Sequence, residues 1–185
     1  LYRNIMVEDY DGQRCLAFTI NRKERYQSCM NLRNPQKLVF PYVRMLFGAL
    51  LLNPSPKRIL MVGLGGGTIP TVLNQIYPDA MISVVEIDEA VVNVAKQFFH
   101  FKTNANLSVT AMDARVFIKR SMIAKEKYDL ILLDAFTGDY IPEHLMTQEF
   151  LEEVKSLLTP DGVIGSNTFS TSKLYDHESV TYGAV

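Results

Sequence analysis

A glycine cluster and three single acids each follow a short apolar run in this chain. The acids are Glu86, Asp113 and Asp134, and the glycine cluster comprises Gly63, Gly65, Gly66 and Gly67. If the apolar runs are parallel strands of one sheet, their carboxyl ends meet at one edge and these groups converge on one crevice. Glycines let a ligand lie against bare backbone, and carboxylates accept hydrogen bonds from hydroxyl and amino groups. The pattern predicts a nucleoside-binding site.

The glycine spacing narrows the choice of nucleoside. Gly63, Gly65 and Gly67 read G-x-G-x-G, the form usual for S-adenosylmethionine enzymes, whereas a dinucleotide fingerprint needs a glycine at the position of Thr68. Glu86 stands 19 residues after Gly67, close to the spacing at which an acid on the second strand accepts both ribose hydroxyls. A free ribose diol is common to NAD and S-adenosylmethionine, so Glu86 alone does not choose between them.

The last two acids suggest separate roles. Asp113 and Ala114 can offer a carboxylate and a backbone N–H to the edge of an adenine ring, although Asp113 also suits the N-cap of a following helix. Asp134 opens a loop that could cover a second substrate.

The remaining residues predict the elements that position these groups. Residues 59–62, 81–85, 107–112 and 128–133 are apolar runs that read as buried strands, and helical patterns alternate with them. Thr68, Asp88 and Thr147 suit the N-caps of the helices that follow. This alternation is typical of an α/β fold: a Rossmann-like, doubly wound parallel sheet covered by helices on both faces.

The first residues follow a different pattern. Asp11-Gly12 between two apolar runs is a strong signal for a hairpin turn. We therefore expect residues 1–37 to form a small antiparallel β-hairpin appendage and residues 38–185 to form the nucleoside-binding domain. Folds of this kind usually close with a further hairpin, so we expect the C-terminus to be truncated.

Composition excludes several function classes. Net charge is −1, with 48% hydrophobic and 21% charged residues, so nothing attracts this chain to nucleic acid or to an anionic membrane. No apolar run approaches the roughly 20 residues that span a bilayer. Cys15 and Cys29 have no metal-ligand spacing, and we expect both to be reduced, in a cytoplasmic enzyme that needs no metal. Among the histidines only His144, beside the loop after Asp134, merits a test, although it also reads as a surface residue.

Together these motifs resemble the spermidine synthase (polyamine aminopropyltransferase) family, which shares the class I S-adenosylmethionine methyltransferase fold. The resemblance rests on residues 40–42, 57–67, 85–88, 113–114 and 128–134. It implies that Glu86 holds the ribose, that Asp113 holds the adenine, and that Asp134 holds the attacking amine; Ile87 and Ala114, which follow two of these acids, are the other predicted cofactor-binding residues. We therefore assign Asp134 the role of orienting the amine and accepting its proton, with Tyr42 and Tyr140 as hydrogen-bonding neighbours. It also implies S-adenosylmethionine or its decarboxylated form as co-substrate, a small amine as acceptor, and a homodimer.

Three positions depart from the family's pattern for binding a polyamine. The family has an Asp in the glycine loop where this chain has Thr68, and it has acids where this chain has Thr137 and Arg44. Each missing carboxylate would face a cationic amine, and a hydrogen bond to a charged group is worth about 1.5–3 kcal/mol. These changes argue against putrescine as the acceptor. The substrate side is assigned to the following candidates: Tyr42, Thr68, Thr137, Asp139 and Tyr140.

Several functions fit this pattern. The leading prediction is a spermidine synthase-like transferase that moves an aminopropyl group to an amine in polyamine biosynthesis. The first alternative is methyl transfer from intact S-adenosylmethionine to an unidentified acceptor, which Thr68 favours because no acid is there for the aminopropyl ammonium. The second is a non-catalytic nucleoside-binding or scaffold protein, which the intact Glu86, Asp113 and Asp134 disfavour. Thr68 also disfavours an NAD-dependent oxidoreductase.

Overall fold

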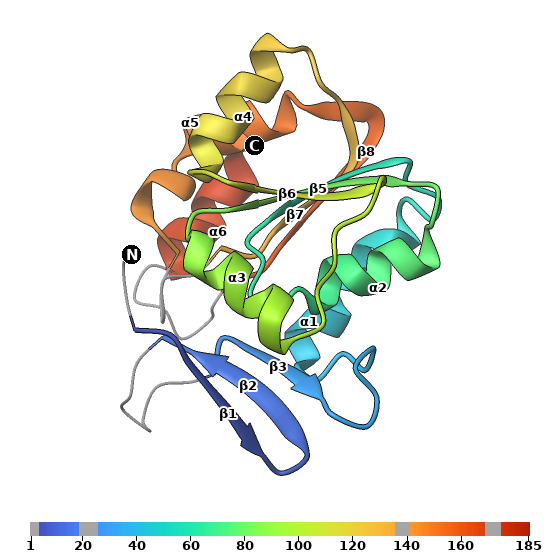
Figure 1. Cartoon of the computed structure of the whole chain (residues 1–185). Helices are drawn as coiled ribbons and strands as arrows, with labels where there is room; N and C mark the ends of the chain where they lie inside the picture. Colours follow the sequence, from blue (N-terminus) through green and yellow to red (C-terminus); the bar gives the residue numbers. More distant parts are fainter. Residues whose placement is uncertain (1–3, 19–25, 136–140, 169–174) are drawn as a thin grey trace.

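The chain contains two β-sheets, one of them flanked by helices (Figure 1). The computed structural model describes residues 4–18, 26–135, 141–168 and 175–185, apart from the side chains of residues 177 and 178. The larger sheet has five strands, which are β4 (Arg58–Val62), β5 (Met81–Glu86), β6 (Leu107–Ala111), β7 (Tyr128–Leu133) and β8 (Leu158–Ser166). Their order in the sheet is β6-β5-β4-β7-β8, and every neighbouring pair is parallel.

This topology confirms the predicted Rossmann-like sheet. From β4 the chain first winds outward through β5 and β6, and it then returns to the other side of β4 to form β7 and β8. In such sheets the winding direction reverses between two central strands, here β4 and β7, and a crevice opens beyond their carboxyl ends. The predicted glycine loop follows β4 and Asp134 follows β7, so both lie at this point.

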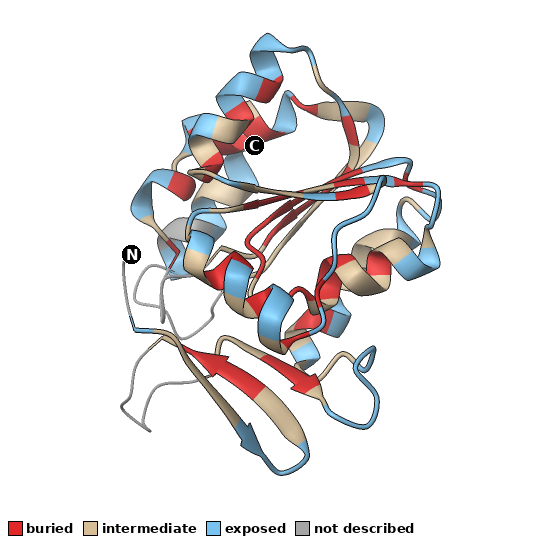
Figure 2. Cartoon of the chain, viewed as in Figure 1, coloured by how far each residue is buried: buried red, intermediate tan, exposed pale blue. Residues whose placement is uncertain are grey.

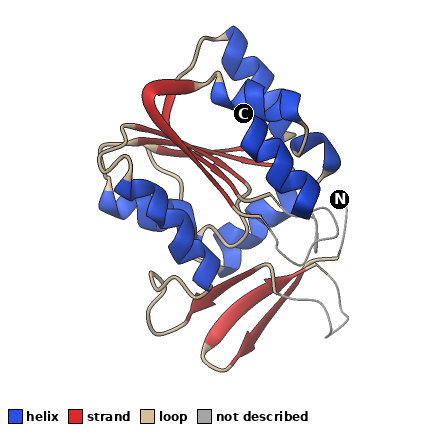
Figure 3. Ribbon diagram, turned by 180° about the vertical axis from the view of Figure 1, so that it is seen from behind, coloured by secondary structure: helices blue, strands red, loops and turns tan. Residues whose placement is uncertain are grey.

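Helices cover both faces of the sheet, as Figures 1 and 3 show. One core cluster joins one face of the sheet to α1, α2 and α3, and the other cluster joins the opposite face to α4 and α5, with α6 packed at its margin. Alternate residues of β4 show this division, because Ile59 and Met61 belong to the first cluster and Leu60 and Val62 to the second. Figure 2 shows the central strands β4, β5 and β7 as the most deeply buried part of this sheet. The helical elements are α1 (Pro41–Leu46), η1 (Phe47–Leu51), α2 (Thr68–Ile76), α3 (Glu89–Phe98), α4 (Ala114–Ile123), η2 (Glu143–Leu145), α5 (Gln148–Lys155) and α6 (Tyr175–Ala184).

The structure confirms two of the three predicted helix N-caps. Asp88 accepts a hydrogen bond from the Ala90 backbone N–H, and Thr147 accepts one from Phe150, so both are N-caps as predicted. The prediction for Thr68 was wrong, because α2 begins with Thr68 and its N-cap is the residue before it. That residue, Gly67, has a left-handed φ of 77°, which glycine adopts at no steric cost.

The smaller sheet confirms the predicted antiparallel appendage and extends it by one strand. It consists of β1 (Met6–Tyr10), β2 (Gln13–Ala17) and β3 (Ser28–Asn31), in the order β1-β2-β3. Asp11 and Gly12 have φ values of 49° and 71°, which the two central residues of a type I′ hairpin turn require. The sheet packs on α3, where the Arg14 guanidinium donates a hydrogen bond to the Phe98 carbonyl at 3.1 Å.

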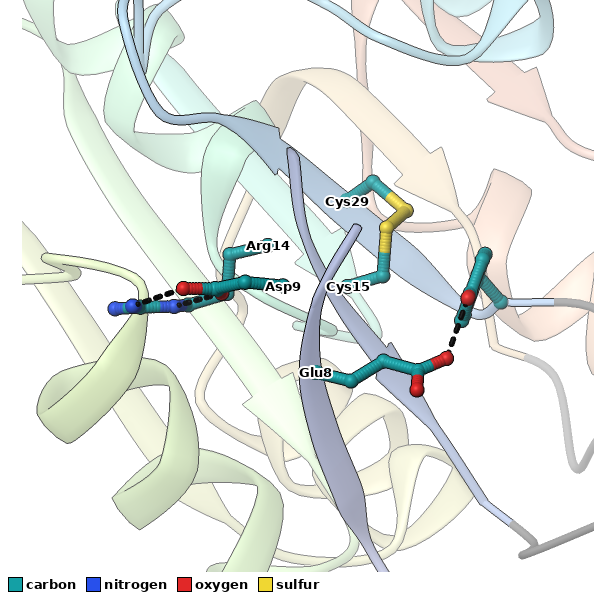
Figure 4. Close-up of a disulfide and its surroundings, with 6 residues drawn as sticks. Glu8, Asp9, Arg14, Cys15 and Cys29 are labelled. Carbon is teal, nitrogen blue, oxygen red and sulfur yellow. Dashed lines mark hydrogen bonds and ion pairs between the residues drawn. A yellow bond between two sulfur atoms is a disulfide. The ribbon is translucent and has the colours of Figure 1, made fainter. Parts of the chain in front are cut away.

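The two cysteines form a disulfide, so the prediction that they are reduced was wrong. Cys15 on β2 and Cys29 on β3 face each other in the antiparallel register, with their Cα atoms 4.1 Å apart (Figure 4). The two cysteines are 14 positions apart in the sequence, and no local pattern indicates that they pair. The register of β2 against β3 brings them together. Both cysteines are buried, and the Asp9–Arg14 ion pair lies beside them on the same sheet.

Candidate active site

A cavity of about 570 Å³ opens at the carboxyl edge of the parallel sheet. All five parallel strands contribute to its wall through their last residues or the residues that follow them, and the small sheet and the start of α1 complete it. The predicted site residues that line it are Tyr42, Gly63, Gly65, Glu86, Ile87, Asp113, Ala114 and Asp134. The sequence therefore located part of the wall of this cavity.

Gly66 and Gly67 were also predicted to contact the ligand, but the structure places them behind the cavity wall. A Cβ on Gly66 would lie 2.8 Å from the ring of Phe99, and one on Gly67 would lie 2.6 Å from the ring of Phe101. Neither glycine lines the cavity. Their lack of side chains lets the loop pack against these aromatic rings, so their contribution is to the loop's position.

Glu86 links the end of β5 to the glycine loop. One carboxylate oxygen accepts a hydrogen bond from the Leu64 backbone N–H at 3.0 Å, and the other accepts one from the Asp88 backbone N–H at 3.0 Å. Burial raises the pKa of Glu86, and the hydrogen bonds from backbone N–H groups oppose that change. The carboxylate is thus fixed in orientation at the cavity wall, where a ribose diol could donate to its remaining lone pairs.

Asp113 has two partners, one of them unexpected. Its Oδ1 accepts from the Val116 backbone N–H at 3.0 Å, so Asp113 is the N-cap of α4, one of the roles that the sequence left open. Its Oδ2 lies 2.9 Å from Nε2 of His144, which also lines the cavity. The Asp113 carboxylate therefore caps α4 and lines the cavity at the same time.

Asp134 lies at the cavity wall between two neutral hydrogen-bond donors. The Asn167 side-chain amide donates to its Oδ1 at 2.8 Å, and the Tyr42 hydroxyl also donates to this carboxylate. Burial raises the pKa of Asp134 to about 7, while the hydrogen bonds from Asn167 and Tyr42 act in the opposite direction. Burial, followed by the nearby Asp134 charge, raises the pKa of Tyr42 as well. A carboxyl group with this pKa can accept a proton near neutral pH.

Sequence reasoning missed Asn167 and the contribution of the small sheet. Asn167 directly follows β8 and was available as the polar residue at the end of the fifth strand. Phe18, Tyr26 and Gln27, at the ends of β2 and β3, also line the cavity. No local pattern predicted this, because it depends on how the small sheet packs against the larger one.

The predicted substrate residues, and the departing residue Arg44, differ in where they lie relative to the cavity. Thr68 lines a second cavity of about 30 Å³, which Tyr42 and Asp134 also border, so it lies near the proposed base. Arg44 is exposed, lines neither cavity, and places its guanidinium 3.5 Å from the Val39 carbonyl oxygen. Three further candidates, Thr137, Asp139 and Tyr140, lie outside the described residues.

The described part of the chain has no recognisable metal site: no group of three or more His, Cys, Asp or Glu side chains in it is arranged to hold a metal ion. Nor does any helix in those residues have the length and apolar character needed to cross a membrane.

The sequence matches a known family across most of its length. A family model described as "Spermine/spermidine synthase domain" matches residues 39–183, which include the whole parallel sheet and its edge. The chain belongs to this family. The match begins two residues before α1, so the small sheet lies outside it.

Individual proteins of this family and of this fold are also similar to the chain. A polyamine aminopropyltransferase of Vibrio vulnificus is 52% identical over 187 residues, covering 100% of this chain, and this chain spans 62% of that relative's length. The structure of a probable spermidine synthase from Corynebacterium glutamicum has a TM-score of 0.78 at 23% identity, covering 98% of this chain and 67% of that one. The structure of human methyltransferase-like protein 13 in complex with SAH has a TM-score of 0.69 at 29% identity, covering 79% of this chain and 73% of that one. The fold is therefore one that aminopropyltransferases and methyltransferases share.

Proposed function

We propose that this chain transfers an aminopropyl group from decarboxylated S-adenosylmethionine to a small amine. One observation carries the proposal: Asp134, with a pKa of about 7, lies between the hydrogen-bond donors Tyr42 and Asn167 at the wall of a nucleoside-sized cavity. The 52% identity to a polyamine aminopropyltransferase supports the same reaction class. This chain spans 62% of the length of that relative, so aminopropyl transfer is a proposal for this chain.

The donor would occupy the cavity along the strand ends. Glu86 would accept hydrogen bonds from both ribose hydroxyls, and Asp113 with the Ala114 N–H would bind the adenine edge. Ile87 and Leu145, which line the cavity near these groups, would supply apolar contacts to the base. Gly63 and Gly65 line the cavity, so the glycine loop would present bare backbone to the middle of the donor.

The reaction is a displacement at a carbon bonded to a sulfonium ion. The amine lone pair forms the new C–N bond, the C–S bond breaks, and its electron pair stays on sulfur to give 5′-methylthioadenosine. The electrophile arrives already activated, so alignment of nitrogen, carbon and sulfur is the main task of the protein. Asp134 orients the amine and accepts the proton that it loses, directly or through water. Tyr42 and Asn167 hold the carboxylate in place for this transfer.

Methyl transfer from intact S-adenosylmethionine is the second candidate. The similarity to methyltransferase-like protein 13 favours it, as does Thr68, which borders the second cavity with a hydroxyl in place of a carboxylate. A donor ammonium without a carboxylate partner loses a charged hydrogen bond worth about 1.5–3 kcal/mol. The two reactions leave different products, 5′-methylthioadenosine and S-adenosylhomocysteine.

Product analysis by mass spectrometry decides between these reactions. The full protein would be incubated with decarboxylated S-adenosylmethionine or with the intact donor, each with a panel of mono-, di- and polyamines. Formation of 5′-methylthioadenosine only with the decarboxylated donor supports the proposal, and the mass of the alkylated amine identifies the acceptor. S-adenosylhomocysteine and a methylated product would establish the second candidate. If neither product forms and calorimetric titration shows that neither donor binds, both candidates fail and a non-catalytic protein is favoured.

A further inference from the structure

His144 occupies a defined position at the rim of the cavity, although nearly half of its side chain (48%) is exposed. Its Nε2 lies 2.9 Å from Oδ2 of Asp113, while the other oxygen of that carboxylate accepts from the Val116 N–H at 3.0 Å. The carboxylate is thus held at both oxygens, by a backbone group of α4 and by a side chain of η2. Two separate elements fix the orientation of this group.

The backbone of His144 is itself tied to α4. Its carbonyl oxygen accepts a hydrogen bond from the Arg115 guanidinium at 3.2 Å, and Arg115 also forms an ion pair with Glu153 at 3.1 Å. The next residue, Leu145, is buried in the core on that face. Because Arg115 and Asp113 belong to the same helix start, the start of α4 contacts both the backbone and the imidazole of His144.

This arrangement has a consequence for the choice of purine. Nε2 of His144 carries the hydrogen when it donates to Asp113, which leaves each carboxylate oxygen with unused acceptor capacity. A carboxylate held in this orientation toward the cavity accepts from the exocyclic amine of adenine. A 6-oxo purine places an oxygen at the same point, and two acceptors facing each other repel.

We propose that His144 is a positioning residue that fixes the Asp113 carboxylate for recognition of a 6-amino purine, and thereby sets the preference of the site for adenosine over inosine donors. The inference rests on the proposed function, in which Asp113 faces the adenine edge. A surface hydrogen bond without this role would leave purine selectivity unchanged when His144 is replaced.

Calorimetric titration with two nucleosides tests the proposal. The dissociation constants of 5′-methylthioadenosine and 5′-methylthioinosine would be measured for the wild-type protein and for His144→Ala, His144→Gln and Glu143→Ala. Glu143→Ala is the matched control, because Glu143 is exposed in the same short turn and does not line the cavity. His144→Gln retains an N–H donor near the position of Nε2, and thermal unfolding of each variant verifies that it is folded.

His144→Ala is expected to weaken binding of 5′-methylthioadenosine by about three- to tenfold, as for loss of one hydrogen bond, and to leave 5′-methylthioinosine nearly unchanged. His144→Gln should restore most of the selectivity, and Glu143→Ala should match the wild type. If His144→Ala is folded and the ratio of the two dissociation constants stays at its wild-type value, whether or not both constants rise, this inference alone is overturned. If the wild-type protein binds neither nucleoside, the proposed function and this inference fail together.

Discussion

Gly63 and Asp134 approach so closely that a Cβ on Gly63 would lie 2.2 Å from the Asp134 backbone oxygen. The two turns are also joined by the sheet, since the Asp134 N–H donates to the Val62 carbonyl at 2.8 Å. The turn that would carry the donor and the turn that carries the proposed base are therefore one packed unit. A change in either turn displaces the other.

Replacing Gly63 tests this unit directly. Its φ of 95° is strained for any L-residue, and the added methyl group meets backbone that cannot turn away. We expect Gly63→Ala to destabilise the protein by about 3 kcal/mol or more and to abolish donor binding. Gly48→Ala is the control, since nothing lies within 4 Å of a Cβ there, and its melting temperature should stay close to that of the wild type. Equal melting temperatures for the two variants would contradict the close packing.

Asp134→Asn should remove the proton acceptor while keeping the shape of the side chain. General base catalysis contributes roughly 10²- to 10⁴-fold, so kcat is expected to fall by about that factor. The dissociation constant of 5′-methylthioadenosine should change much less, because Asp134 would face the acceptor amine. Steady-state kinetics and calorimetry measure the two quantities, with Asp79→Asn, an exposed acid at the opposite end of the sheet, as control. A full loss of nucleoside binding in Asp134→Asn would argue that Asp134 holds the donor instead.

The same variant should change how stability depends on pH. The pKa of Asp134 is raised from 3.8 to about 7 by burial, so between these values the folded chain keeps a proton that the unfolded chain has lost. The contribution of this group to stability is therefore present below about pH 4 and is lost as pH rises to about 7. Each pKa unit corresponds to about 1.4 kcal/mol, which makes this a loss of a few kcal/mol at most.

Chemical denaturation of the ligand-free protein at several pH values measures this loss. Asp134→Asn should be more stable than the wild type at pH 8 and similar to it at pH 4. A difference between the two proteins that is constant across this range would contradict the raised pKa.

The neighbours of Asp134 should set the pH at which the enzyme becomes active. The Tyr42 and Asn167 hydrogen bonds stabilise the charged carboxylate and so lower the pKa of Asp134. We expect Tyr42→Phe to move the acidic limb of the kcat/KM profile upward by about half to one pH unit, the equivalent of one hydrogen bond. Tyr77→Phe, whose hydroxyl donates to the Pro54 carbonyl far from the cavity, is the matched control. A limb that stays in place in Tyr42→Phe would exclude Asp134 as the group that titrates.

The disulfide should stabilise the small sheet and, through it, the glycine loop. Ser28, beside Cys29, lies 3.2 Å from where a Cβ of Gly65 would be, so β3 packs directly on that loop. A cross-link that closes a loop of about 15 residues is worth roughly 3 kcal/mol. A reductant such as dithiothreitol should therefore lower the melting temperature of the wild type, and the double variant Cys15→Ser/Cys29→Ser should be insensitive to it. Identical melting curves with and without reductant would show that the cross-link contributes nothing.

Much of the cavity wall could be predicted because each group follows a strand. Apolar runs identify the strands, and in a parallel sheet every carboxyl end points to the same edge, so Glu86, Asp113 and Asp134 had to converge. The two roles weighed for Asp113 also came from local chemistry, because an acid before a helix can cap it. The error at Thr68 was local as well: Gly67, in a left-handed conformation, took the cap position.

The sequence by itself thus determined the fold class, the hairpin turn, two helix caps and the acids at the sheet edge, because each depends on residues close together in the chain. Only the tertiary structure paired Cys15 with Cys29, placed Asn167 on Asp134, and brought His144 to Asp113. Those contacts join segments that are distant in sequence, and strand register and packing decide which of them meet. The raised pKa of Asp134 is likewise decided by the tertiary structure, since burial by the surrounding elements causes it.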